Sequence, residues 1–184
     1  MLNIITISIA YPISISFLNI GMFFKIAITA SKFDTFLNIV ENNLYNLFIS
    51  FFMHKVEHRV IYGDTDAGQV VYYSNYFRWF ESGRRELLRN LKINYISLGK
   101  RGIITPVVEA HCNYLHPARY DDIVVVETRI SEVKEKSIKF YYKVFRKKDR
   151  ELLASGYTIN VFVNSKKMKS IKIPDNIRKK IKIG

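Results

Sequence analysis

The second half of the chain is dominated by long strand-like segments, and this feature most limits the folds it can adopt. In one of them, Ile138, Phe140, Tyr142 and Val144 alternate with a second set that includes two lysines, which is typical of a strand with one face on a core. Short polar turns join the segments, and such turns favour antiparallel neighbours because parallel ones need a crossover of a dozen or more residues. The four strand-like segments are ITPVVEAHCNYL, DDIVVVETRISEV, KSIKFYYKVFRK and ELLASGYTINVFVN.

Two further elements precede these segments. The stretch VEHRVIYG, which begins at Val56, alternates in the manner of a half-buried strand. From Ser74 or Asn75, either of which can cap a helix, apolar residues recur with a helical period as far as Leu91. The pattern predicts a single helix of about 17 residues.

These elements predict an α+β fold in which an antiparallel sheet of about five strands follows one long helix. Such a sheet has too few elements to cover both of its faces. We therefore expect it to wrap around the helix and to pair one edge with another subunit, which makes the protein a homo-oligomer. The final stretch, IPDNIRKKIKIG, is either a short helix that begins at Pro174 or a frayed tail.

The chain has two compositionally different parts. Residues 1–52 hold two basic and two acidic residues, so the whole formal net charge of +13 belongs to residues 53–184, the predicted globular domain. The first 24 residues carry no charge, and that length approaches the roughly 20 apolar residues that cross a bilayer. Pro12, several polar residues and the lack of a basic leader argue against insertion and secretion. The alternatives are a membrane or peripheral anchor, a folded accessory segment, or an extension upstream of a true start at Met53.

The basic residues of the globular part do not gather in one patch, which argues against nucleic acid as the partner. A phosphate-bearing cofactor or an acidic carrier protein would use the same charge. Cys112 is the only cysteine and cannot form an internal disulfide, so the chain fits a reducing compartment, the cytoplasm. The basic clusters are Arg84, Arg85 and Arg89 on the predicted helix, Lys134 and Lys136 in a turn, and Lys166, Lys167 and Lys169 near the end.

Three catalytic or metal motifs fail on inspection. HKVEH has the spacing of an inverted zinc-protease motif, but His54 and His58 continue into a strand, where they lie too far apart to bind one ion. DTDAGQ resembles the start of a calcium loop, yet Gln69 and Asn75 replace the required Gly and Glu. An aspartyl phosphotransferase needs a parallel sheet, which the chain does not predict. No metal site is expected.

The stretch YGDTDAGQVVYYSNYFRWFE places two carboxylates in a turn just before the predicted helix. A helix N-terminus offers unpaired N–H groups and partial positive charge, which stabilise an oxygen that becomes negative during a reaction. Asp66 lies seven residues before Tyr73, in a loop that can bring a carboxylate back to that terminus. The other interpretation is that Asp64 and Asp66 only satisfy backbone donors of the turn.

The same stretch resembles the signature of the hotdog-fold acyl-CoA thioesterases, the group that contains 4-hydroxybenzoyl-CoA thioesterase and the bacterial YbgC-type enzymes. The likeness continues through ITPVVEAHCNYLHPARYDDIVVVETRISEVKEKS and so covers most of residues 56–165, whereas residues 1–52 have no counterpart. The resemblance implies a sheet wrapped around the helix, dimers that join two sheets edge to edge, and active sites at the subunit boundary.

The resemblance also implies roles for individual residues. Asp66 matches the catalytic carboxylate, either a nucleophile or a general base for water, and the backbone N–H of Tyr73 matches the donor to the carbonyl oxygen. Glu81 matches a position near the acyl pocket, although it is explained equally well as an acidic residue on the helix surface. Lys134 and Lys136 match basic residues that hold the coenzyme A phosphates, although charged turns are common. No cofactor is implied other than coenzyme A as part of the substrate.

One position departs from the family pattern. Members usually carry Gly three residues after the catalytic Asp, where this chain has Gln69, with Gly68 one position earlier. If that position needs a positive φ, Gln69 strains the loop, unless Gly68 supplies the same freedom.

The expected activity is hydrolysis of a small or medium acyl-CoA, or of an acyl carrier protein thioester, by a homodimer or homotetramer in the cytoplasm or at the inner face of the membrane. One alternative is a non-catalytic acyl-CoA or acyl-carrier-protein binding protein. Another is a hotdog dehydratase for hydroxyacyl thioesters, which would need a histidine beside the acid. His111 and His116 are the candidates for that role.

Overall fold

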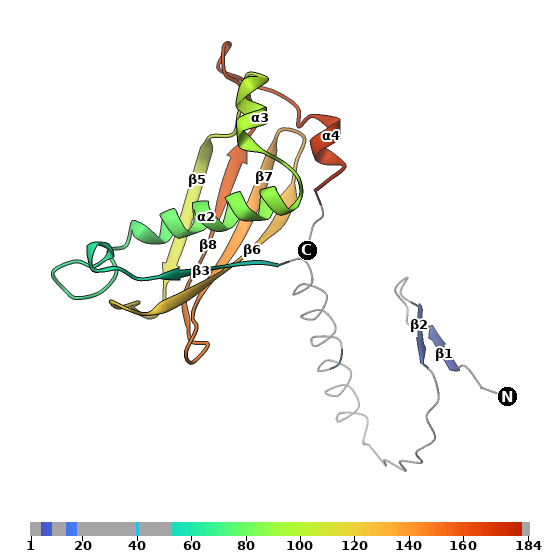
Figure 1. Cartoon of the computed structure of the whole chain (residues 1–184). Coiled ribbons are helices and arrows are strands. Elements are labelled where there is room, and N and C mark those ends of the chain that lie inside the picture. Colours follow the sequence, from blue (N-terminus) through green and yellow to red (C-terminus); the bar gives the residue numbers. More distant parts are fainter. Residues whose placement is uncertain (1–4, 9–13, 18–39, 41–52, 182–184) are drawn as a thin grey trace. The chain divides into compact units, whose positions relative to one another are not determined.

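A computed structural model describes residues 5–8, 14–17, 40 and 53–181 (Figure 1). The chain divides into two compact units, residues 1–42 and 43–184, and each is treated by itself. In the first unit, β1 (Ile5–Ser8) pairs with β2 (Ser14–Phe17) in an antiparallel hairpin. The expectations for the rest of residues 1–52 lie outside the described residues. Within the described part of the chain, no helix has the length and apolar character that spanning a bilayer requires.

The second unit is built on one antiparallel five-stranded sheet, as predicted. Figure 1 shows the long strands side by side, with one long helix crossing them. Because all neighbours are antiparallel, short hairpins connect β6 to β7 and β7 to β8. In pairing order, the strands are β3 (His54–Arg59), β6 (Ile123–Val133), β7 (Ser137–Arg146), β8 (Leu152–Val161) and β5 (Val107–Tyr114).

Two of the predicted strands are shorter than their sequence patterns and continue into a separate small sheet. The first is interrupted before Pro106, a residue that has no N–H for a ladder and whose carbonyl accepts from the amide of Val161 (3.1 Å). The second is interrupted at Phe162, whose amide donates to the carbonyl of Lys136 (2.8 Å). The small sheet contains, in order, β10 (Lys169–Ser170), β9 (Val163–Asn164) and β4 (Ile103–Ile104).

The predicted long helix is α2 (Asn75–Asn90), with Ser74 at its N-cap. Its apolar face packs on the sheet, and the ring of Phe80 stacks on that of Tyr142 with centroids 4.3 Å apart. This close approach requires a glycine below the helix: a Cβ on Gly156 would lie 2.3 Å from the carbonyl oxygen of His111 and 2.7 Å from the ring of Phe80. The helix position is therefore fixed by packing.

The sequence patterns do not predict the short helix α3 (Tyr95–Lys100), which follows α2. Asn94 caps it, since its Oδ1 accepts from the amides of Ile96 (2.8 Å) and Ser97 (3.4 Å). Only Leu98 of this helix is buried, so the apolar periodicity that reveals longer helices is missing.

At the end of the described chain, α4 (Asp175–Arg178) confirms the helical alternative for the final stretch. Pro174 stands at its N-cap, where the missing proline N–H has no consequence. Ile177 is its buried residue and enters the core of the second unit.

Candidate active site

The acidic stretch forms a compact turn between β3 and α2. A 3-10 helix, η1 (Tyr62–Asp64), leads into an antiparallel bridge between Thr65 and Val71. Inside this bridge, the amide of Asp66 donates to the carbonyl of Val70, and the amide of Gln69 donates to the carbonyl of Asp66, each at 2.9 Å. The backbone around Asp66 is therefore held by its own hydrogen bonds.

Asp66 lies at the surface of a single chain. Its Oδ1 accepts from the amide of Gly68 (2.8 Å). The carboxylate lies near the start of α2: the pKa of Tyr72 is raised, mainly by a hydrogen bond with Tyr73 and to a smaller extent by the charge of Asp66. Asp66 lines neither the cavity beneath α3 nor the surface hollow beside α2. One chain thus leaves one side of this carboxylate open.

Asp64 has a different environment, which explains why the chain holds two carboxylates so close together. Its Oδ2 accepts from the amide of Ile61 (3.1 Å), and its Oδ1 lies 3.8 Å from Nη1 of Arg78. Its carbonyl accepts from the side chain of Asn75 (2.8 Å) and the amide of Tyr72 (2.9 Å). Asp64 therefore connects this loop to the first helical turn of α2. Its carboxylate accepts from a backbone N–H, as Asp side chains commonly do in turns.

The backbone of Tyr73 is bonded through its carbonyl, while its N–H has no partner in the part of the chain that the structure describes. The carbonyl of Tyr73 accepts from the hydroxyl of Tyr114 on β5 (3.0 Å). Within the described residues, the amide of Tyr73 donates to no acceptor. An unpaired N–H just before a 16-residue helix is a ready donor to an oxygen that gains negative charge.

Arg146 holds the loop between β5 and β6, and the turn that carries Asp66 is hydrogen-bonded to this loop. Its guanidinium donates to Asp122 Oδ2 (3.2 Å) and to the carbonyl of Pro117 (2.9 Å), and it forms further ion pairs with Asp149 and Glu151. These bonds fix the loop between β5 and β6. The amide of Val71 donates to the carbonyl of Ala118 in that loop (2.9 Å), and so links the turn to it.

The departure from the family pattern has a structural counterpart at Gln69. Its φ is 59°, in the left-handed region that favours glycine. Gly68 lies outside that region, so it does not supply the freedom one position earlier. The strain expected from the sequence therefore falls on Gln69 itself.

Glu81 lies on the exposed side of α2 and lines a surface hollow of about 370 Å³. Asp64, Arg78 and Arg85 share this hollow, together with His58, whose pKa is lowered by burial. The structure thus places Glu81 in the same hollow as Asp64, and Asp66 is not part of it.

Lys134 and Lys136 occupy the turn between β6 and β7. The amide of Lys134 donates to the carbonyl of Ser137 (2.9 Å), and its Nζ lies 3.5 Å from Glu132. The Asp66 turn packs near the other end of β6, a strand of 11 residues that spans roughly 36 Å. Within one chain, the structure does not bring these lysines to Asp66.

The histidines of the dehydratase alternative have other partners. His111 is exposed on β5 and stacks on Tyr157 with centroids 5.4 Å apart. His116 lies 3.6 Å from Glu151. Among the described residues, neither contacts Asp66 by a hydrogen bond or an ion pair.

Burial raises the pKa of the nearby Cys112 thiol to about 11, so it is protonated at neutral pH.

Several known thioesterases have similar sequences and folds. The sequence profile described as "Thioesterase-like superfamily" matches residues 60–181. The acyl-CoA thioesterase YbgC of Haemophilus influenzae is 37% identical over 122 residues, which cover 65% of this chain and 88% of that protein. This chain belongs to the thioesterase-like superfamily.

Solved structures agree. The DHNA-CoA thioesterase of Staphylococcus aureus has a TM-score of 0.63 and 29% identity, with 65% of this chain and 80% of that one covered. A variant of 4-hydroxybenzoyl-CoA thioesterase, complexed with 4-hydroxybenzoyl-CoA, has a TM-score of 0.66 and 25% identity, with 71% and 99% covered. The predicted hotdog fold and the class of thioester hydrolase are confirmed.

Proposed function

We propose that this thioesterase hydrolyses small or medium acyl-CoA thioesters with Asp66 and the backbone N–H of Tyr73. The observation that carries the proposal is the amide of Tyr73 just before α2, which has no partner among the described residues, while the hydroxyl of Tyr114 holds the adjoining Tyr73 carbonyl. An oxygen placed against this amide would be stabilised by a directed hydrogen bond and by the positive end of the helix dipole.

In the proposed reaction, the thioester carbonyl oxygen accepts from the N–H of Tyr73. Asp66 either attacks the carbonyl carbon, to give an acyl-enzyme anhydride that water then cleaves, or takes a proton from the attacking water. Coenzyme A leaves as its thiolate and the acyl group leaves as a free acid. No other cofactor takes part. Loss of a single oxyanion donor typically lowers kcat by about 10²- to 10³-fold, so the Tyr73 amide is a major contributor.

A second copy of the chain completes the proposed site. β5 is an edge strand, and all its side chains except Cys112 are exposed, including Val107, Val108 and Tyr114. An unpaired edge with exposed apolar residues invites pairing with an identical edge. Because Tyr114 on this edge donates to the carbonyl of Tyr73, the edge lies beside the site, and a partner paired there would cover its open side. The basic turn of a second copy would then supply Lys134 and Lys136 to the coenzyme A phosphates.

The test of chemistry is steady-state hydrolysis of an acyl-CoA panel by the full chain and its Asp66→Asn variant. We expect kcat to fall at least about 100-fold with little change in KM. Asp64→Asn is the matched control, since it alters the neighbouring carboxylate and affects folding rather than chemistry. Unchanged turnover in Asp66→Asn refutes the role of Asp66. Tight acyl-CoA binding without turnover by the unmodified chain would favour the non-catalytic alternative.

The test of assembly is light scattering on the Val108→Lys variant, which places a charge on the β5 edge. We expect a monomer with little turnover, whereas Ile96→Lys, on the exposed surface of α3, stays an active oligomer. A fully active monomer of the unmodified chain would show that the site needs no partner.

A further inference from the structure

The last part of the described chain is strongly basic and folds at one end of the five-stranded sheet. Residues 164–181 hold seven basic residues and one acidic residue, so this short segment carries a net charge of +6 out of the +13 of the chain. All seven basic side chains are exposed. Figure 1 shows α3 and α4 at the same end of the long strands. We call α3 and residues 164–181 together the basic end.

The turn between β9 and β10 holds two adjacent lysines whose charges are not compensated. Oδ1 of Asn164 accepts from the amides of Lys166 (3.1 Å) and Lys167 (2.9 Å), so the backbone and not the lysine side chains shapes the turn. The amide of Ser165 donates to the carbonyl of Gly102, just after α3, and joins the turn to that helix (2.9 Å). In the described part of the chain, neither lysine forms an ion pair with a carboxylate, and both are exposed to solvent.

Two large apolar side chains are exposed beside the charges of the basic end. Met168 follows Lys167 in the same turn, precedes Lys169 and is 70% exposed. Ile96 is 71% exposed and lies four residues before Lys100, so the two share a face of α3. A lipid surface binds this combination, because anionic headgroups attract the basic side chains and the interfacial layer takes up the apolar ones.

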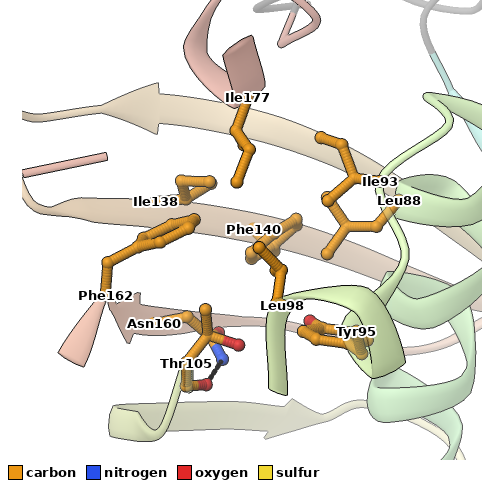
Figure 2. A pocket seen from close by; sticks show the side chains of 10 residues that line it. All are labelled: Leu88, Ile93, Tyr95, Leu98, Thr105, Ile138, Phe140, Asn160, Phe162 and Ile177. Atoms are coloured by element: carbon orange, nitrogen blue, oxygen red, sulfur yellow. Dashed lines mark hydrogen bonds between the residues drawn. The ribbon is translucent and has the colours of Figure 1, made fainter. Parts of the chain in front are cut away.

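The basic end has a fixed backbone because both of its helices are anchored in the core. Leu98 of α3 and Ile177 of α4 are buried, and they line the same small cavity of about 10 Å³ as Phe140 of β7 (Figure 2). The guanidinium of Arg178 donates to the carbonyl of Lys134 (2.9 Å), which holds α4 on the turn between β6 and β7. A surface with an ordered backbone loses less conformational entropy when it binds.

We propose that the basic end docks the protein on a membrane surface that contains anionic phospholipids. Lysines of the β9–β10 turn and of α4 contact the headgroups, and Met168 inserts into the interfacial layer. Proteins that bind single-stranded nucleic acid place aromatic side chains among their charges for stacking, whereas the exposed apolar residues here are a methionine and an isoleucine. The contact uses neither residues 1–52 nor Asp66, so it stands independently of catalysis.

The experiment measures cosedimentation of the full chain with vesicles. Vesicles of phosphatidylcholine alone are compared with vesicles of phosphatidylcholine and phosphatidylglycerol. The test variant, Lys166→Gln with Lys167→Gln, removes two charges from the β9–β10 turn. The matched control, Lys147→Gln with Lys148→Gln, removes two adjacent exposed lysines from the turn between β7 and β8, at the other end of β7 from the β6–β7 turn. Polyglutamate and a DNA duplex are the probes for an acidic protein surface and for nucleic acid.

We expect the unmodified chain to bind the anionic vesicles but not the neutral ones, and to bind less tightly as salt screens the charges. Each lysine near an anionic surface changes the affinity about fivefold, so the test variant should bind about 30-fold more weakly, and the matched control should not. Met168→Asn removes the apolar group and tolerates the left-handed φ of 49°, and it should weaken binding about fivefold. Asp66→Asn should bind like the unmodified chain.

Four results would overturn the proposal. The first is failure of the unmodified chain to bind anionic vesicles. The second is unchanged binding by the test variant, which would place the contact elsewhere, as in residues 1–52. The third is equal weakening by the matched control, which would reduce the effect to total charge. The fourth is tighter binding to polyglutamate or DNA than to the anionic vesicles, which would assign the basic end to another class of partner. Urea unfolding of each variant verifies that it is folded.

Discussion

Replacing Gln69 with glycine should stabilise the protein, because this residue adopts a φ of 59° in the turn that carries Asp66. A left-handed conformation costs a non-glycine residue about 1–2 kcal/mol. Glycine loses about 0.5–1 kcal/mol more entropy on folding, which offsets part of that gain. The bonds of the turn survive the change, because the carbonyl of Gln69 still accepts from Arg119 (3.4 Å) and its amide still donates to Asp66 (2.9 Å). The net expectation is a gain of about 0.5–1 kcal/mol.

Urea unfolding at constant protein concentration measures this gain, which corresponds to a rise of a few degrees, about 2–4 °C, in Tm. Gln69→Ala is the first control, since it keeps the strain and should give no stabilisation. Met168→Gly is the second: its φ is 49° in the turn between β9 and β10, so it should stabilise the fold without changing turnover. If Gln69→Gly destabilises the protein, the Gln69 side chain makes compensating contacts and the strain argument is refuted.

Two more predictions concern the surroundings of the site. Arg146→Leu leaves Asp122, Asp149 and Glu151 without their shared partner, so it should lower the free energy of unfolding by about 1.5–2 kcal/mol and reduce kcat, as urea unfolding and kinetics will show. Unchanged stability would mean that water replaces the guanidinium. The raised pKa of Cys112, about 11, should make its alkylation by iodoacetamide about 100-fold slower than that of a free thiol at pH 8, with the rate rising as pH rises to that pKa. Mass spectrometry will measure that rate, and labelling at the free-thiol rate would contradict it.

The sheet and the long helix could be predicted because their signals are periodic. In β3, β7 and most of β8, buried and more exposed residues alternate over six or more positions, and α2 keeps a helical pattern over sixteen. Where the signal depends on a single residue, prediction fails. Pro106 separates β4 from β5 near the start of a strand-like run, and Asn94 starts a helix that buries only Leu98.

The candidate site was predictable only in its local part. Asp66 and Tyr73 are seven residues apart, and the turn that relates them depends on neighbouring residues. The hydrogen bond from Tyr114 to Tyr73 joins residues 41 positions apart. Sequence patterns give no register between distant segments, so they identify Tyr114 only as part of a predicted strand and not as a partner of Tyr73. The same limit applies to Arg146, whose partners come from the β5–β6 loop and its own hairpin.

Arg84 shows a second reason for such failures. It follows Tyr76 and Phe80 at intervals of four residues, so it lies on the buried stripe of α2, although a charged residue next to Arg85 and Glu86 is readily assigned to the solvated face. In such a case, the helical period is a better guide to burial than the residue type, because position 84 lies on the face of α2 that packs on the sheet. A charge at a core position needs polar partners, and Arg84 finds two of them in the hydroxyls of Tyr142 and Thr158 on the facing strands.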